Sequence, residues 1–369
     1  GRYDDAALQH YADMVSALHA RGLAPLITLH HFSNPLWIED QGGWTNPATI
    51  GHFERFVQRV VEALGGGVST WCTINEPMVY ATQGYLFGYF PPGTRSFGQT
   101  IRVAENLLRA HAAAYHAIKA LQPDAQVGLA KHQIALKPGF PALVHRRALN
   151  IVDNFFNRAF VHALTTGTLR FPSRTVSVPE ARDTLDWIGL NYYYRFRVTF
   201  NLLAPRQLFL RQARPRDGIP GPGDTGEIWP EGLFGEIKRL FEMTGKPLYI
   251  TENGVPDIDD SIRPLALIRS LRSVWQAINH NYPVRGYFFW SLVDNFEWAE
   301  GYDPRFRFGL YGCDAETQQR VKRRSADLYG EIGAANALTA EMVRRYVPGQ
   351  AEALFPGVKV KSSVELPQP

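Results

Sequence analysis

The chain has 369 residues, of which 45% are hydrophobic, 12% aromatic and 20% charged, with a net charge of +4. This is the composition of an ordinary folded domain, and the chain lacks the run of about 18 apolar residues that predicts a membrane span. Its basic cluster Lys322-Arg323-Arg324 is too short to indicate nucleic-acid binding. Two cysteines, Cys72 and Cys313, and no recognisable signal peptide favour a cytoplasmic protein.

Helical and strand-like segments alternate along the chain. Helices are predicted where apolar residues recur every three or four positions, at residues 4–22, 47–65, 98–121, 142–166, 231–244, 261–280 and 322–346. Short apolar segments between them predict six strands, beginning near residues 25, 69, 126, 185, 247 and 284. This alternation predicts the α/β class with a parallel sheet. Because no glycine-rich phosphate loop opens a helix, a (β/α)8 TIM barrel with six visible units fits better than a doubly wound sheet.

No linker divides the chain, so residues 1–346 are expected to form one barrel domain. Residues 201–232 are rich in proline, glycine and arginine and have no helical or strand period. We interpret them as a loop that walls the mouth of the active site. Residues 347–369 contain four prolines and are expected to form an extended surface tail.

Two of the expected strands end in a glutamate and are stopped by a turn-forming residue. Pro77 follows Glu76, and Asn253-Gly254 follow Glu252. Barrel enzymes present their reactive groups at the carboxyl ends of strands, where the active site opens. A pair of carboxylates built in this way is the machinery that cleaves glycosidic bonds.

The strand near residue 25 ends in two adjacent histidines, His30 and His31. Neighbours in a strand point to opposite faces, so the two rings are poorly placed to share a metal ion. Binding of a substrate hydroxyl by one of them is the better interpretation, and no metal or other cofactor is expected.

Three motifs together resemble the retaining β-glycosidases of glycoside hydrolase family 1. Thr73-Ile-Asn-Glu-Pro77 is similar to that family's acid/base motif, and Ile250-Thr-Glu-Asn-Gly254 is similar to its nucleophile motif. Trp290-Ser-Leu-Val-Asp-Asn-Phe-Glu-Trp298-Ala-Glu-Gly-Tyr302 is similar to its sugar-binding signature. The resemblance runs from residue 4 to about residue 345. It implies a (β/α)8 barrel that hydrolyses β-glucosides or similar small neutral β-glycosides through a glycosyl-enzyme intermediate.

The resemblance also implies a role for individual residues. Glu252 is then the nucleophile and Glu76 the acid/base, in a retaining site whose carboxyl groups lie about 5–5.5 Å apart. Mutual repulsion is expected to raise the pKa of Glu76 while Glu252 stays charged. Asn75 would bind the sugar 2-hydroxyl, and Tyr193 would orient the nucleophile. The substrate-binding residues implied are His31, Asn191, Trp290, Glu297, Trp298 and Phe306.

The chain departs from the family pattern in three places. The segment Asp303-Pro-Arg-Phe-Arg-Phe-Gly-Leu310 doubles an Arg-Phe pair, so either Phe306 or Phe308 could line the pocket. Phe32 and Ser33 stand where many members have tryptophan and aspartate. The family's first two strand–helix units, which supply a glutamine to the sugar site and an arginine beside the nucleophile, have no counterpart.

A barrel without these two units is expected to have two open sheet edges. Either residues upstream of the given sequence supply these units, or the barrel is shortened. A shortened barrel could be non-catalytic, alone or as a homo-oligomer, and bind a sugar or another ligand in its open cavity. A transglycosylase would use the same residues and differ only in its acceptor.

Overall fold

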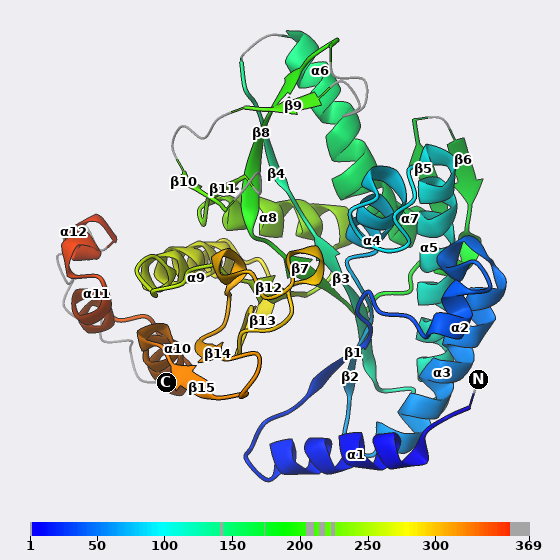
Figure 1. Cartoon of the computed structure of the whole chain (residues 1–369), viewed down its shortest axis with the longest axis horizontal. Helices are drawn as coiled ribbons and strands as arrows, with labels where there is room; N and C mark the ends of the chain where they lie inside the picture. The colour runs from blue at the N-terminus through cyan, green and yellow to red at the C-terminus, as the bar shows by residue number, and fades with distance from the viewer. Residues whose placement is uncertain are drawn as a thin grey trace, which may run out of the picture.

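A curled sheet of six parallel strands forms the centre of the molecule (Figure 1). The computed structural model describes residues 2–354, except residues 141–142, 173, 204–209, 214–217 and 223–225. In space the strands follow their chain order: β1 (Leu26–His30), β2 (Thr70–Asn75), β3 (Gln126–His132), β7 (Trp187–Asn191), β12 (Leu248–Asn253) and β13 (Val284–Phe289). The six expected strands are confirmed. Among the described strands, β1 and β13 each pair on one side only, so both are edges of this sheet.

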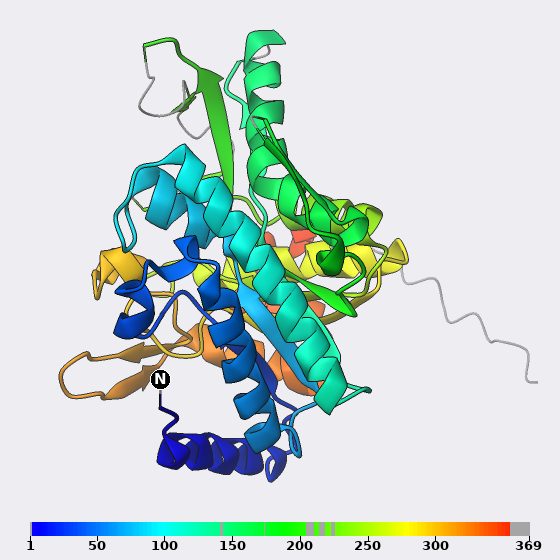
Figure 2. The same cartoon turned by 90° about the vertical axis from the view of Figure 1, so that its right-hand side faces the viewer.

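Helices connect successive strands and cover the outer face of the sheet (Figures 1 and 2). They are α1 (Asp5–His19), α3 (Ala48–Leu64), α5 (Phe97–Leu121), α7 (Ala159–Thr166), α8 (Gly232–Thr244), α9 (Arg263–Asn279) and α10 (Arg324–Ala335). Each packs against the next along the chain, which is the outer layer of a TIM-type fold. No helix in the described part of the chain is both long and apolar enough to cross a membrane.

Local sequence signals explain where these helices begin and end. The Asp4 side chain accepts a hydrogen bond from the backbone of Ala7 and caps α1. Ser96 caps α5 in the same way through the backbone of Gln99. Gly245 ends α8 with φ at 63°, a conformation that glycine adopts without strain. The predicted helix bounds are therefore close to the observed ones here.

Two of the long predicted helices are broken in the structure. The segment 142–166 contains α6 (Leu143–Val152), a π-helical stretch over Asp153–Arg158, and α7. The segment 322–346 contains α10 and a separate α11 (Ala340–Tyr346). Asn336 ends α10 in the left-handed conformation with φ at 45°. Asparagine tolerates this conformation better than most residues, so the helix ends there although the apolar period of the sequence continues.

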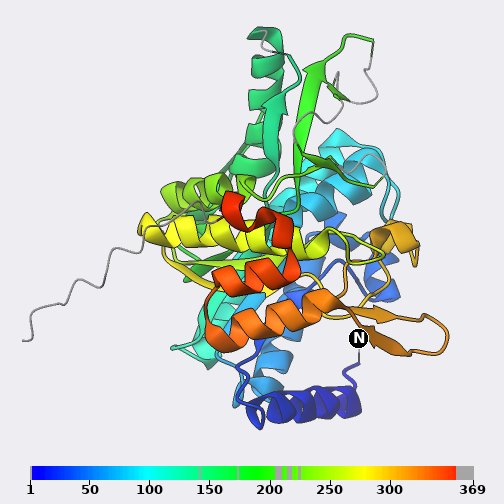
Figure 3. The same ribbon diagram turned by 90° about the vertical axis from the view of Figure 1, so that its left-hand side faces the viewer.

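The extended-tail prediction is wrong for its first part. Pro348–Gln350 form a 3₁₀ turn and Ala351–Leu354 form α12. Leu354 packs into a cluster with Leu267 and Ile268 of α9, so burial of one apolar side chain docks this segment (Figure 3). Residues 355–369 lie outside the described residues.

Segment 201–232 is not the unstructured loop that its composition predicts. Three short strands lie in or at the edge of it: β9 (Leu210–Gln212), β10 (Ile219–Pro220) and β11 (Glu227–Ile228). They form a second sheet with β8 (Tyr194–Phe200) and β4 (Ala135–Pro138), which rises above the first in Figure 1. Strands of two or three residues are too short to show a period. Pairing decides their conformation: β9 and β11 pair with β8, and β10 pairs with β11.

A buried ion cluster ties this second sheet together. Arg195 of β8 donates from Nε to Oε2 of Glu227 at 2.6 Å, and Arg197 donates to Oε1 at 2.8 Å. Glu227 is 2% exposed and Arg195 is 1% exposed. The Arg195 guanidinium also lies 3.6 Å from the ring centroid of Trp229. Because Arg195 comes two residues after Tyr193, this cluster fixes the backbone next to the candidate site.

The variant Glu227→Gln should destabilise the fold by about 3 kcal/mol, because it leaves buried guanidinium charge without its carboxylate. Urea denaturation followed by circular dichroism measures the loss. Glu231→Gln is the matched control, since Glu231 pairs with Arg269 at a partly exposed site. That change should cost less than about 1 kcal/mol. Equal losses in the two variants would contradict a structural role for the buried cluster.

Candidate active site

The carboxyl ends of four neighbouring strands bring polar side chains together. Asn75 is the last residue of β2, and Glu76 follows it directly. His132 ends β3, Asn191 ends β7, and Glu252 lies near the end of β12. His132 pairs with Asn191 in the β3–β7 register, and Glu252 pairs with Asn191 in the β12–β7 register. Parallel pairing therefore aligns these residues at one edge of the sheet.

Glu76 is held by two hydrogen bonds to a single oxygen. Asn191 donates to its Oε1 at 2.8 Å, and Nδ1 of His132 lies 2.9 Å from the same oxygen. Glu76 has φ at 45°, so the chain turns sharply there before Pro77 starts α4 (Pro77–Thr82). Burial raises the pKa of Glu76, but the charge and hydrogen bond of His132, together with Asn191, outweigh it and leave the pKa lowered.

Glu252 has fewer donors than Glu76. The Tyr193 hydroxyl donates to its Oε2 at 2.6 Å. Burial raises the pKa of Glu252 well above its usual value, and the nearby charge of Glu76 raises it further, while Tyr193 acts in the opposite direction. Among the described residues, no lysine or arginine forms an ion pair with Glu252. Although the two glutamates are 176 positions apart in the chain (252 − 76), the charge of Glu76 therefore acts on Glu252 without a neighbouring cation that would offset it.

The expected distribution of charge between the two glutamates is reversed. The sequence predicted a raised pKa for Glu76 and a charged Glu252, but the structure gives a lowered pKa for Glu76 and a raised one for Glu252. Burial and then the charge of Glu76 raise the pKa of Glu252, whereas the charge and the hydrogen bond of His132 overcome burial and lower the pKa of Glu76. Donation of a proton to a leaving group requires the opposite arrangement, with Glu76 protonated and Glu252 charged.

Aromatic rings gather around His31, next to the carboxyl end of β2. The rings of His31 and Trp290 stack with centroids 5.7 Å apart, and those of His31 and Trp298 stack 5.5 Å apart. Phe32 contacts Trp298 edge-on at 4.9 Å. His31 also lies 3.1 Å from Nδ2 of Asn75, which links the rings to the strand ends. The structure thus brings together three of the predicted sugar-binding residues.

The other histidine of the pair lies elsewhere, as the strand geometry predicts. His30 packs edge-on against Trp44 and Phe53, and its Nε2 lies 3.0 Å from Oδ1 of Asn34. Burial lowers the pKa of His30 to about 4, so it is neutral. His30 supports the core and His31 faces the site.

Glu297 has an unsatisfied oxygen. Its Oε2 is buried and has no hydrogen-bond partner in the described structure. Burial raises the pKa of Glu297 to about 7, against a hydrogen bond from Trp290 that lowers it. A buried acceptor without a donor costs free energy, which a ligand hydroxyl would recover. Glu297 is therefore well suited to bind a hydroxyl-rich ligand.

Asn191 does not have the position of a substrate-binding residue. It is 0% exposed, its Nδ2 donates to Glu76 and Asn75, and its Oδ1 accepts from Thr251 at 2.5 Å. With both polar atoms used by neighbours, it holds the strand ends in place. Its contact with substrate stays a prediction.

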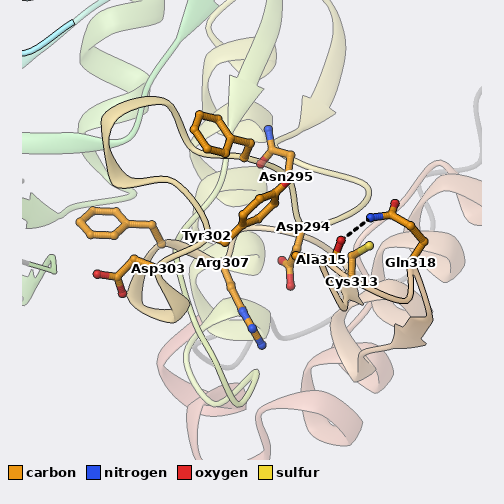
Figure 4. A pocket seen from close by; sticks show the side chains of 10 residues that line it. Asp294, Asn295, Tyr302, Asp303, Arg307, Cys313, Ala315 and Gln318 are labelled. Atoms are coloured by element: carbon orange, nitrogen blue, oxygen red, sulfur yellow. Dashed lines mark hydrogen bonds between the residues drawn. The ribbon is translucent and has the colours of Figure 1, made fainter.

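The structure separates the two candidate phenylalanines. Phe308 meets the ring of Tyr193 edge-on with centroids 5.7 Å apart. Phe306 instead lines a different hollow of about 270 Å³, together with Tyr302, Asp303 and Arg307 (Figure 4). Neither glutamate of the carboxylate pair lines this hollow. Phe308 rather than Phe306 therefore lies against Tyr193, the residue that donates to Glu252.

One residue of the site was missed by the sequence analysis. His132 touches Glu76 and stacks on Tyr193 with centroids 6.0 Å apart and planes 20° apart. Its position at the end of a predicted strand was the available signal, since the other polar strand ends were all singled out.

Two glutamates at strand ends, with stacked aromatic rings nearby and an unsatisfied acceptor on Glu297, form an arrangement typical of a glycoside hydrolase. The sequence comparison agrees, because the profile of glycosyl hydrolase family 1 matches residues 1–338. The chain belongs to this family.

Its relatives include the β-glucosidase A of Thermotoga maritima, which is 31% identical over 92% of this chain and 79% of that protein. A β-glycosidase structure from Pyrococcus horikoshii superimposes with a TM-score of 0.86 at 36% identity, covering 94% of this chain and 79% of that one. The Thermotoga maritima β-glucosidase in complex with deoxynojirimycin superimposes with a TM-score of 0.84 at 30% identity, covering 92% and 80%. The TIM-barrel type of fold and the resemblance to β-glycosidases are confirmed.

Proposed function

We propose that this glycoside hydrolase cleaves β-glucosides or similar small neutral β-glycosides with retention, using Glu252 as nucleophile and Glu76 as acid/base. The observation that carries the proposal is the pair of strand-end glutamates: Glu76 directly follows β2, Glu252 lies near the end of β12, and the Tyr193 hydroxyl donates to Oε2 of Glu252. The similarity to β-glucosidases and β-galactosidases supports this substrate class. Similarity to a human cytosolic β-glucosidase supports a cytoplasmic location.

The reaction follows in two steps. A carboxylate oxygen of Glu252 attacks the anomeric carbon while Glu76 gives its proton to the leaving oxygen. Water then attacks the same carbon, Glu252 leaves as a carboxylate, and Glu76 takes the proton of the water. Two inversions give net retention. The stacked rings of Trp290 and His31 offer an apolar face for the sugar ring.

Glu297 favours a neutral sugar. It lies close enough to Glu76 for the charge of Glu76 to raise its pKa further. In its ionised form above about pH 7 it would accept hydrogen bonds from sugar hydroxyls and repel a phosphate on the same sugar. A phosphorylated hexoside is therefore disfavoured.

Hydrolysis of an aryl β-glucoside, followed by proton NMR, tests the proposal. The first product should be β-glucose, which then mutarotates to the mixture of anomers. Release of α-glucose first would establish inversion and overturn the nucleophilic role of Glu252. A folded chain without turnover on glucosides or galactosides would favour the non-catalytic alternative.

The variant Tyr193→Phe should reduce kcat/KM at pH 6 by about tenfold to a hundredfold, because a hydrogen bond to a charged group contributes about 1.5–3 kcal/mol. Tyr193 lowers the pKa of Glu252, so its loss raises that pKa further and leaves less charged nucleophile. The acid limb of the pH profile of kcat/KM should therefore move to higher pH.

The neighbouring Tyr192→Phe is the matched control. Tyr192 donates its hydroxyl proton to the backbone of Trp229 and does not bond to either glutamate. This variant should leave the acid limb in place even if it lowers stability. An unchanged limb in Tyr193→Phe would show that the hydroxyl does not tune the nucleophile.

A further inference from the structure

His132 joins the two halves of the candidate site. Its Nδ1 lies 2.9 Å from Oε1 of Glu76, and its ring stacks on Tyr193, the residue that donates to Glu252. Phe156 packs edge-on against the same ring at 6.0 Å and limits its rotation. The imidazole is thus held between the acid/base and the partner of the nucleophile.

The two carboxylate oxygens of Glu76 differ in their hydrogen bonds. Both donors, His132 and Asn191, bind Oε1, and no described residue donates to Oε2. A carboxylate only accepts hydrogen bonds, so the imidazole must carry its proton on Nδ1 when Glu76 is ionised. Oε2 is then the oxygen left to exchange a proton during the reaction.

We propose that His132 is a positioning residue for the second half-reaction, in which its Nδ1–H holds Oε1 of the Glu76 carboxylate so that Oε2 accepts a proton from water. This inference rests on the proposed function. In that step the water oxygen bonds to the anomeric carbon, the bond from that carbon to the Glu252 oxygen breaks, and the water proton passes to Glu76. Because a donor to Oε1 stabilises the charged form, His132 keeps Glu76 ready to act as a base.

Other charged and titratable groups face Glu76 from the elements around it. They are His31 after β1, Lys131 from β3, Tyr193 after β7, Glu252 from β12 and Glu297 after β13. None of these hydrogen-bonds to the Glu76 carboxylate in the described structure, whereas His132 does. Removing His132 therefore changes the direct contact and leaves these surrounding groups in place.

Two variants separate the hydrogen bond from the packing. His132→Phe keeps a ring against Tyr193 and removes the donor. His132→Asn keeps a donor at nearly the same distance from the backbone, because the amide nitrogen of asparagine and Nδ1 of histidine are both bonded to Cγ. If the hydrogen bond matters, the asparagine variant resembles the natural protein and the phenylalanine variant does not. If only packing on Tyr193 matters, the order is reversed.

A glucoside with a 2,4-dinitrophenyl leaving group isolates the second step. This leaving group departs without protonation, so hydrolysis of the glycosyl-enzyme should limit kcat. In His132→Phe we expect kcat and KM at pH 6 to fall together by about tenfold. This is less than the loss of the general base itself would cause, because Glu76 is still present. The acid limb of kcat should move to higher pH, since Glu76 loses a donor that favours its charge. Intact-protein mass spectrometry should show more glycosyl-enzyme at steady state.

Three results would overturn the proposal. They are an unchanged kcat in His132→Phe, an equal fall of kcat/KM in both variants, and normal kinetics in His132→Phe with a defect in His132→Asn. Carbon-13 NMR of the Glu76 carboxyl in the Glu252→Gln background gives a test without turnover. There the pKa of Glu76 should be higher in His132→Phe than with histidine or asparagine, and an equal pKa would overturn the proposal. If the natural chain does not hydrolyse glycosides, this titration still decides the role of His132, so the two failures are distinguishable.

Discussion

The variant Glu252→Ala should lose at least about ten-thousandfold in kcat/KM on an aryl β-glucoside, because no covalent intermediate forms without the nucleophile. Alanine also leaves a space below the anomeric carbon. Sodium azide should enter this space, attack from the α face and restore part of the turnover. The product is then α-glucosyl azide, which NMR identifies.

A matched control guards against a loss that comes from misfolding. Glu316 is exposed in the turn between β14 (Tyr311–Cys313) and β15 (Arg320–Lys322), so Glu316→Ala removes the same side chain far from the strand ends. Its activity should equal that of the natural chain. Activity in Glu252→Ala without azide that matches this control would exclude Glu252 as the nucleophile.

The variant Glu76→Ala should lose activity in proportion to how much the leaving group needs a proton. With an alkyl β-glucoside, kcat/KM should fall by about 10²–10⁴-fold, the usual contribution of a general acid. With the 2,4-dinitrophenyl glucoside, kcat/KM should change far less, because that phenolate leaves without help. The kinetics with both substrates, measured at one pH, check this difference.

Azide gives a second and opposite signature for Glu76→Ala. Here Glu252 still forms the glycosyl-enzyme, and azide attacks it from the face that Glu76 occupied. The product should be β-glucosyl azide, in contrast to the α anomer from Glu252→Ala. The same anomer from both variants, or an equal loss with both substrates, would contradict the assignment of roles.

Agreement between sequence and structure is best where residues close in the chain decide the outcome. The six strands and the caps of α1 and α5 follow from apolar period and capping residues. The predictions were wrong where a contact between residues far apart in the chain decides the local conformation. Docking of Leu354 against α9 made a helix of a segment expected to be extended, and pairing of β11 with β8 and of β10 with β11 made strands of residues expected to form a loop.

The sequence by itself determined which two glutamates end strands, which aromatic residues accompany them, and the family to which the chain belongs. These are properties of short motifs whose spacing the chain itself carries. Only the tertiary structure decided that His132 and Asn191 both bind Oε1 of Glu76, that Phe308 lies against Tyr193, and that Glu252 has the raised pKa. A pKa depends on burial and on donors within hydrogen-bonding distance. For Glu76 those donors come from β3 and β7, more than fifty positions away in the chain, and only the curled sheet brings them together.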